Sequence, residues 1–224
     1  MVVLATKCYV AGEARERALD GMGSLVANAL EELAVEYDVG VRGDEFVAVT
    51  LTGEDAPVAR NLLREEWGTV TDHFDDGETY TGTLDAWDED ALYLDAGEEI
   101  AVDTDGLGLG VGTADQIRDR FGLVQHLPLE FVYDADGDHE LAETARDRLY
   151  EWTRGDGRLN VNSATRAEVR ATVNRAGHAR DIVTVERLGL LEQSVLCEPA
   201  TDPPGLLAAV GEHLPAELKC VVPQ

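Results

Sequence analysis

The feature that most restricts the fold of this chain is an order of hydrophobic segments that occurs twice. Residues 1–73 predict strand, helix, strand, strand, helix and strand, because short apolar runs alternate with stretches whose apolar residues recur every three to four positions. Residues 159–222 predict the same order, although the two runs show no similarity of sequence. Each run therefore predicts an antiparallel sheet with two helices on one face.

The first run contains the clearer signals. Apolar residues at helical spacing predict a helix over about residues 13–34. Asp55 is expected to start a second helix that ends at Gly68, and Thr69–Phe74 is expected to form the last strand. This order is that of a ferredoxin-like sandwich, which we assign to residues 1–74.

The middle of the chain, residues 75–135, predicts a small β-rich unit with one helix. Short strand signals separated by polar turns occur at Tyr80–Leu84, Leu92–Asp95 and Ile100–Val102. A loop with alternating glycines, Gly106–Gly112, then precedes a helix that Thr113 and Gln116 would cap. A phosphate could bind where this loop meets the helix, but a tight connection explains the glycines better, since no P-loop ending follows.

Residues 136–224 predict a linker helix, carrying Leu141 to Trp152, and then the second ferredoxin-like unit. In that unit a capping box of Thr165 and Glu168 should start a helix. A hairpin is expected across Gly189, with its second strand starting at Leu190. The predicted fold class is thus α+β: two ferredoxin-like βαββαβ units flanking a small β-rich, S1/OB-like unit.

The charge of the chain indicates its environment. The 224 residues include 18 Lys and Arg against 45 Asp and Glu, a net charge of -27, and only Lys7 and Lys219 are lysines. Such a charge repels itself at ordinary ionic strength but is screened in molar salt. Acid enrichment with lysine depletion indicates adaptation to the salt-filled cytoplasm of an extremely halophilic cell. An acidic mimic of nucleic acid, the alternative, would not need the loss of lysine.

Several classes of protein are disfavoured. An odd number of distant cysteines, three in all, argues against a disulfide framework, and the histidines are scattered without metal-ligand spacing. Asp134–Asp138 resembles a calcium loop but lacks its register. No leader peptide, spanning segment or nucleophile motif is present, so we expect a cytoplasmic protein and predict no catalytic residue, metal or cofactor.

Three stretches resemble an archaeal family described only as a domain of unknown function. They are Gly82–Asp95 with Leu107–Gly110, Phe121–Leu129, and Gly177–Glu192. The resemblance spans the whole chain and implies an archaeal cytoplasmic protein, but it implies no activity, cofactor or catalytic residue. The middle segment is also similar to a ribosomal S1-type barrel in the spacing of Gly82, Leu92 and Asp95–Gly97, which suggests nucleic-acid binding.

The main departure from the acidity is a run rich in arginine. Between Arg146 and Arg187 there are nine arginines and six acids, a net of +3 within a chain of -27. Arg166, Arg170 and Asn174 are four residues apart and would form one stripe of a helix. The candidate partner-binding residues are Arg154, Arg158, Arg166, Arg170, Asn174, Arg175, His178, Arg180 and Arg187.

Two interpretations of this run remain open. Arginine bonds phosphate bidentately and stacks on bases, so the run could contact RNA or the ribosome, or else an acidic protein. Alternatively, the arginines pair with neighbouring acids, such as Glu168, Asp181 and Glu186. We expect a non-enzymatic binding protein of archaeal information processing that contacts RNA or the ribosome. The alternatives are a protein–protein scaffold and, third, an enzyme of unidentified class, which a polar pocket around His126 or His178 would favour.

Overall fold

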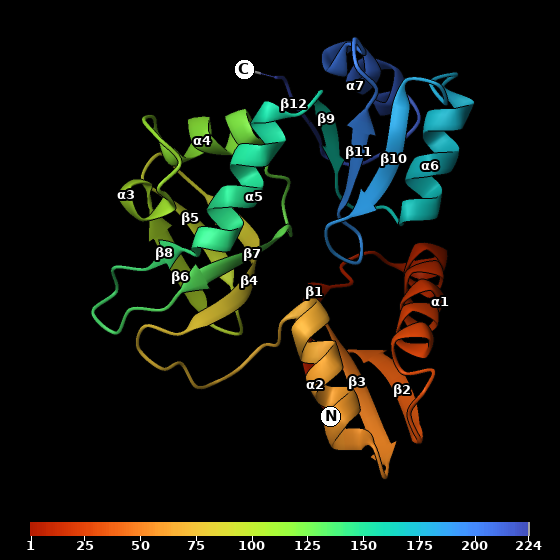
Figure 1. The fold of residues 1–224 in the computed structure, drawn as a ribbon, viewed down its shortest axis with the longest axis vertical. Helices are drawn as coiled ribbons and strands as arrows, with labels where there is room; N and C mark the ends of the chain where they lie inside the picture. Colours follow the sequence, from red (N-terminus) through yellow and green to blue (C-terminus); the bar gives the residue numbers. More distant parts are fainter. Residues whose placement is uncertain (224) are drawn as a thin grey trace.

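A computed structural model of the chain describes residues 1–223 as three groups of elements packed against one another (Figure 1). The fold over these residues is mixed α+β, with seven helices and three antiparallel sheets. No helix in this part of the chain is long and apolar enough to cross a membrane.

The first group is a three-stranded sheet covered by two helices, and its strand order is β1-β3-β2. Its elements are β1 (Val2–Lys7), α1 (Gly12–Ala29), β2 (Val35–Val41), β3 (Phe46–Gly53) and α2 (Ala56–Trp67). Helix α1 is shorter than predicted, because the backbone turns after Ala29 while Leu30 remains buried. The apolar residues that follow the helix lie in a turn that packs on the same core, so their spacing resembled a continued helix.

The fourth strand expected over Thr69–Phe74 is wrong. Only Thr69 forms a bridge, to Leu4, and the backbone nitrogen of Val70 donates to the oxygen of Val3 at 3.0 Å. Gly68 has φ +66°, and a β-carbon there would lie 2.6 Å from Oγ1 of Thr81. Pairing with β1 stops at Val70, and residues 71–78 then cross to the second sheet as bends and turns.

The middle group is a five-stranded sheet of order β6-β5-β4-β7-β8. Its elements are β4 (Thr79–Trp87), β5 (Ala91–Asp95), β6 (Glu99–Asp103), α3 (Thr104–Leu107), α4 (Ala114–Phe121), β7 (Pro128–Val132), β8 (Glu140–Leu141) and α5 (Glu143–Arg154). The predicted capping box of Thr113 and Gln116 starts α4. Helix α5 buries Leu149 and Trp152 in this core, whereas the expected boundary at residue 136 grouped it with the last unit.

The last group is a four-stranded sheet of order β10-β11-β9-β12. Its elements are β9 (Arg158–Val161), α6 (Arg166–Arg175), β10 (Ile182–Arg187), β11 (Gln193–Cys197), α7 (Pro203–Gly211) and β12 (Leu218–Val221). Its core lies between the sheet and the two helices, around Leu159, Val173 and Leu206.

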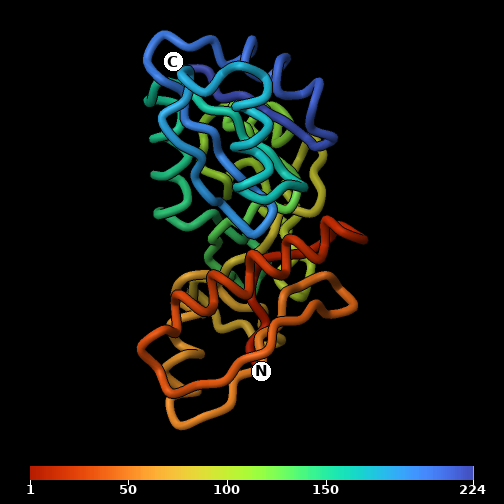
Figure 2. The backbone as a smooth tube through the Cα atoms, turned by 90° about the vertical axis from the view of Figure 1, so that its right-hand side faces the viewer, coloured from red at the N-terminus to blue at the C-terminus, as the bar shows by residue number. Residues whose placement is uncertain are grey.

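The turn between β10 and β11 connects the last group to the first. Leu190 and Leu191, which we expected to begin a strand, instead lie in the core of the first group, and β11 starts only at Gln193. The backbone nitrogen of Leu190 donates to Oγ1 of Thr6 at 3.0 Å. Viewed from the side, the first group lies beneath the other two (Figure 2), which meet it partly through this turn.

Candidate nucleic-acid interface

Helix α6 presents a stripe of arginines beside the face that it buries. Thr165 accepts a hydrogen bond from the backbone nitrogen of Glu168, and the Glu168 carboxylate accepts one from Thr165 N at 2.9 Å, so the predicted capping box forms. Val169 and Val173 are fully buried against the sheet. Arg166 and Arg170, each three residues before one of these valines, lie on the neighbouring stripe and are exposed.

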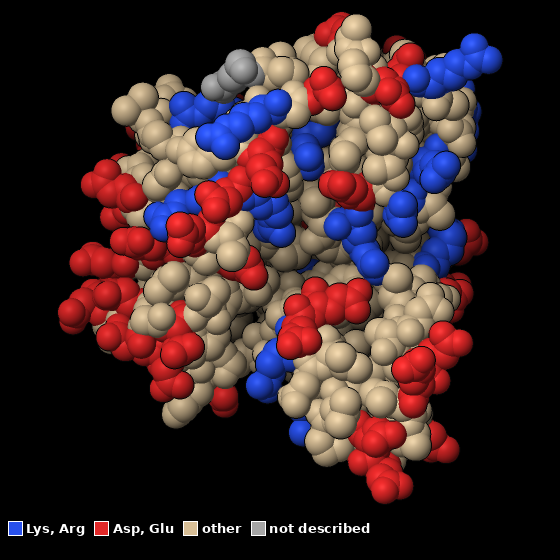
Figure 3. Space-filling view, viewed as in Figure 1, with Lys and Arg blue, Asp and Glu red and all other residues tan. Residues whose placement is uncertain are grey.

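The arginines of this face have no intramolecular partner. Residues 1–223 place no carboxylate within 4.0 Å of four exposed guanidinium groups and no hydrogen-bond acceptor beside them. These are the groups of Arg166, Arg170, Arg175 and Arg180, and Asn174 is exposed among them. We call these five residues the α6 surface. In Figure 3, blue side chains gather over the region of α6 and β10, whereas red side chains crowd the left and lower edges.

The acids expected to neutralise the α6 surface have other partners. Glu168 binds Arg17 of α1 at 2.9 Å, Asp181 binds His178 at 2.7 Å, and Glu186 lies 3.7 Å from Arg158. Burial opposes ionisation of Glu168, but hydrogen bonds from Thr165 and Arg17 outweigh it and lower its pKa. The ion pairs of these three acids therefore leave the α6 surface positively charged.

Two of the predicted arginines contact aromatic rings of the chain. Arg158 lies on the face of its sheet opposite α6, with its guanidinium 4.7 Å from the Trp152 ring and 3.2 Å from the Ser194 hydroxyl. Burial lowers the pKa of Arg158. Arg187 is 5.1 Å from the ring of Trp67 and 3.9 Å from Glu66, so it connects the last group to α2. Both arginines therefore serve contacts within the chain.

Arg154 and His178 complete the predicted set. Arg154 is on α5, 5.8 Å from the ring of Tyr150, and it lines a small hollow with Arg120 of α4. His178 follows α6 but bonds to Asp181. The nine predicted residues thus form no single surface. Arg166, Arg170 and Asn174 share one stripe of α6, Arg175 ends the helix, and His178 and Arg180 follow it, whereas Arg154, Arg158 and Arg187 lie on other elements.

A polar centre that no sequence pattern predicted lies where the three groups meet. The Tyr9 hydroxyl donates to Oε1 of Glu192 at 2.7 Å and accepts from the backbone nitrogen of Ser163 at 2.8 Å. The Tyr9 ring lies 3.9 Å from the His126 ring. His126 and Ser163 have φ of 66° and 58°, a left-handed conformation that costs energy for residues other than glycine. These two strained residues contact the same tyrosine.

The polar centre contains two groups with altered protonation. Glu192 is fully buried, which raises its pKa to about 8, while a hydrogen bond from Tyr9 acts in the opposite direction. Burial and then the charge of Lys7 lower the pKa of His126 to about 4. Lys7 itself is 5% exposed and binds Asp95 at 2.6 Å. The one signal in the sequence was an acid, Glu192, within an apolar run.

Two further predictions concerned ligands. In the Gly106–Gly112 loop, Arg120 donates to the carbonyls of Leu109 and Val111, and Tyr150 donates to that of Gly108. These bonds support a structural connection. Within the described chain, no three His, Cys, Asp or Glu side chains gather as a metal site requires. In the predicted calcium-like segment, the Asp134 carboxylate instead accepts from the backbone of Asp136 and Asp138.

The geometry defines an α+β protein of three consecutive groups with one exposed arginine-rich helix. Three models of one family match the chain in the same succession: the DUF2110 N-terminal domain at residues 1–73, the DUF2110 central domain at residues 74–153, and the DUF2110 C-terminal domain at residues 156–222. The chain therefore belongs to the DUF2110 family. This confirms the predicted membership of a family of unknown function. A search of curated proteins finds no match to the chain.

Proposed function

We propose that this protein binds RNA, without catalysing a reaction, through the α6 surface. One observation carries the proposal: Arg166, Arg170, Arg175 and Arg180 are exposed and, within residues 1–223, unpaired, although the chain has a net charge of -27. A chain with abundant acids could neutralise these arginines. A polyanionic partner explains why their charges are left free.

RNA suits the surface better than duplex DNA. In molar salt the release of counterions contributes little to affinity, so attraction to phosphate alone is weak. Bidentate hydrogen bonds and stacking of guanidinium planes on exposed bases persist, and single-stranded RNA offers both partners. Asn174 adds an amide that can bond to base edges. The α6 surface therefore favours structured RNA with unpaired bases.

The strand orders and the acidity suggest the fold of each group and the kind of cell in which the protein works. We infer that the first and last groups are ferredoxin-like, because β10-β11-β9-β12 is the order expected of a βαββαβ unit and the bridge at Thr69 places a fourth segment beside β1. We further infer an S1/OB-like character for the middle sheet. The acidity supports work in the salt-rich cytoplasm of a halophilic archaeon, where the ribosome is the most abundant source of such RNA.

The direct test is RNA binding by a charge-reversal variant at about 1 M KCl, where the Debye length is about 3 Å. The probes are an RNA hairpin with an unpaired loop and a DNA duplex of equal length. Arg166→Glu with Arg170→Glu should weaken binding of the hairpin by about tenfold or more, since hydrogen bonds to charged groups contribute about 1.5–3 kcal/mol each. The far-ultraviolet circular dichroism should be unchanged, because exposed substitutions change stability by about 0.5 kcal/mol or less.

The matched control is Arg42→Glu with Arg154→Glu. It produces the same change of net charge at two exposed arginines, on the β2–β3 hairpin and on α5, and should leave binding of the hairpin unchanged. Equal retention of RNA by the parent and the α6 variant would contradict the proposal. In that case, capture of an acidic protein by the parent alone would favour the protein–protein alternative.

A further inference from the structure

A polar cleft of about 690 Å³ lies between the first and middle groups. One wall consists of α2 and the start of β1, and the other consists of β4, β7 and α5. Leu188, in the turn that follows β10, closes one side. Arg187 of the last group contacts two lining residues, Glu66 and Trp67, but no residue of the α6 surface lines the cleft, so the two sites are distinct.

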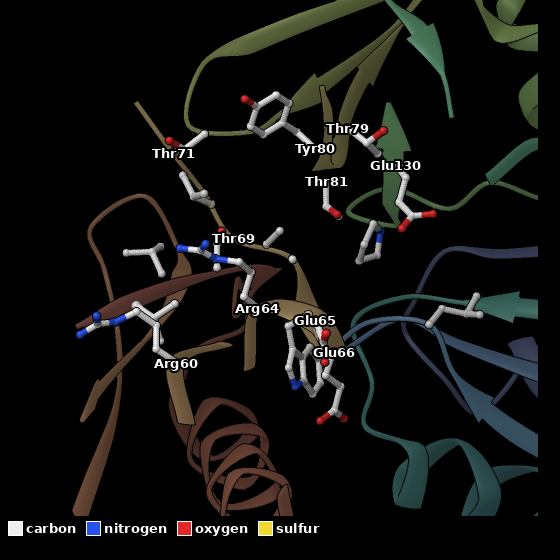
Figure 4. A pocket seen from close by; sticks show the side chains of 18 of the residues that line it. Arg60, Arg64, Glu65, Glu66, Thr69, Thr71, Thr79, Tyr80, Thr81 and Glu130 are labelled. Atoms are coloured by element: carbon white, nitrogen blue, oxygen red, sulfur yellow. The ribbon is translucent and has the colours of Figure 1, made fainter. Parts of the chain in front are cut away.

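Three arginines line this cleft without forming an ion pair within residues 1–223, although the charge of Glu130 acts on Arg148. Arg60 and Arg64 are one helical turn apart on α2, and Arg148 comes from α5. Residues 1–223 place no carboxylate within 4.0 Å of them. The Nε atoms of Arg60 and Arg148 are buried and have no hydrogen-bond partner there. Figure 4 shows the Arg64 side chain extending from α2 toward Thr69.

Two of the three acids that line the cleft bond to residues outside it. Glu66 lies 3.9 Å from Arg187, and the Glu130 carboxylate accepts a hydrogen bond from the Thr144 hydroxyl at 2.7 Å. Only Glu65 lines the cleft with no hydrogen bond or ion pair to residues 1–223. Three guanidinium groups and three carboxylates thus line the cleft, and because Glu66 is paired with Arg187, the guanidinium groups outnumber the acids that lack an arginine partner.

Threonine hydroxyls supply further donors. Thr69, Thr79 and Thr81 line the cavity from the connecting segment and from β4 (Figure 4). Gly68 brings Thr81 close to α2, because any side chain at that position would collide with its hydroxyl. Guanidinium groups and hydroxyls around one cavity are the donor set that tetrahedral phosphate oxygens require.

We propose that this cleft binds a phosphate ester through Arg60, Arg64, Arg148 and the threonine hydroxyls. Its volume falls within the range of about 300–1,000 Å³ that holds a small organic ligand, so a nucleotide fits as well as the phosphorylated end of an RNA chain. Planar guanidinium groups bond to phosphate oxygens in pairs and keep this ability in concentrated salt. The site does not depend on the α6 surface, because the two share no arginine.

Isothermal titration calorimetry of the full chain in about 1 M KCl, the salt that screens its own charge, tests the site. The probes are adenosine 5′-monophosphate, adenosine, and a short RNA with either a 5′-phosphate or a 5′-hydroxyl. Saturable binding of the monophosphate but not of adenosine would show that the ligand is a free nucleotide. Binding of the 5′-phosphorylated RNA alone would show that the ligand is the phosphorylated end of an RNA chain. Either result supports the proposal.

The double variant Arg60→Gln/Arg64→Gln should bind the phosphorylated probe with an affinity lower by about tenfold or more. Arg42→Gln, on a distant hairpin, should not. Both arginines are on one helix surface and Gln is a good helix former, so the variant should fold. If urea denaturation shows that it does not, the single variant Arg64→Gln replaces it. Absence of saturable binding to every phosphorylated probe, or equal affinity in parent and variant, would overturn the proposal. Loss of phosphate binding in the Arg166→Glu/Arg170→Glu variant would also overturn it, since the sites would not be separate.

Discussion

The Tyr9 hydroxyl donates a 2.7 Å hydrogen bond to Oε1 of Glu192, which joins the first group of elements to the last across 183 positions of sequence. Glu192 is fully buried in the turn that inserts Leu190 and Leu191 into the first core. The same hydroxyl accepts from the backbone nitrogen of Ser163. Burial, followed by the negative potential of Glu192, raises the pKa of Tyr9 well above its ordinary value, so the phenol keeps its proton. This contact orients the last group, and the α6 surface with it, relative to the first.

Replacing Tyr9 by phenylalanine should therefore destabilise the whole chain. The Tyr9→Phe variant removes one hydroxyl but leaves two polar atoms, Glu192 Oε1 and Ser163 N, without their partner. Unsatisfied buried groups cost about 1–3 kcal/mol, which urea denaturation should register as a lower free energy of unfolding. Tyr93→Phe is the control, because its hydroxyl bonds to Asp88 at the surface and its loss should matter less. Equal stability of Tyr9→Phe and the parent would show that the contact does not fix the groups.

The pKa of Glu192 predicts that stability falls as pH rises from about 6.5 to about 8. The ordinary pKa of about 4.5 applies in the unfolded chain, and burial raises it to about 8 in the folded chain. Between these values the folded state holds a proton that the unfolded state has lost, so raising the pH favours unfolding. His126 acts in the opposite direction, since its lowered pKa of about 4 makes stability rise with pH up to about 6.5. Above that pH Glu192 acts without this opposition.

The measurement is the free energy of unfolding at pH 6.5 and pH 8, in constant salt. The parent should lose about 1–2 kcal/mol over this interval, as linkage allows up to about 1.4 kcal/mol per pH unit. Glu192→Gln, which keeps the size and the bond from Tyr9, should flatten the dependence, and Glu198→Gln at an exposed site should not. A parent whose stability is unchanged over the interval would mean that the buried carboxyl group loses its proton without cost.

The sequence could predict the elements whose signals are local. The capping boxes at Thr113 and Thr165 start α4 and α6 as expected, because each needs only two residues three positions apart. The turn carrying Leu190 was misread as a strand, since an apolar run gives no sign that it enters another group's core. The strand expected at Thr69–Phe74 did not form either, because the segment pairs with β1 only at Thr69 and Val70 before it crosses to the second sheet.

In the candidate site, too, the sequence predicted local features but not contacts between distant segments. Helical spacing placed Arg166 and Arg170 together, and the structure agrees. Which arginines pair internally depends on contacts between distant segments, such as Arg17 with Glu168 and Arg187 with Glu66, and no spacing predicts those. The polar centre at Tyr9 and the arginines of the cleft likewise come together only when the three groups pack.

The net charge of -27 predicts a strong dependence of stability on salt. Raising KCl from about 0.1 M to about 1 M shortens the Debye length from about 10 Å to about 3 Å, which screens the repulsion among the acids. The thermal midpoint followed by circular dichroism should therefore rise steeply over this range. A midpoint that stays constant would contradict adaptation to a salt-filled cytoplasm.

The central claim, that the α6 surface contacts RNA, is tested most directly by ultraviolet crosslinking of the chain to RNA in native cells, with mass spectrometry of the crosslinked peptides. Crosslinked nucleotides should map mainly to residues 166–180, and the Arg166→Glu/Arg170→Glu variant should lose them while keeping its circular dichroism. Crosslinks confined to other segments, or equally abundant in that variant, would contradict the assignment of α6 as the RNA-binding surface.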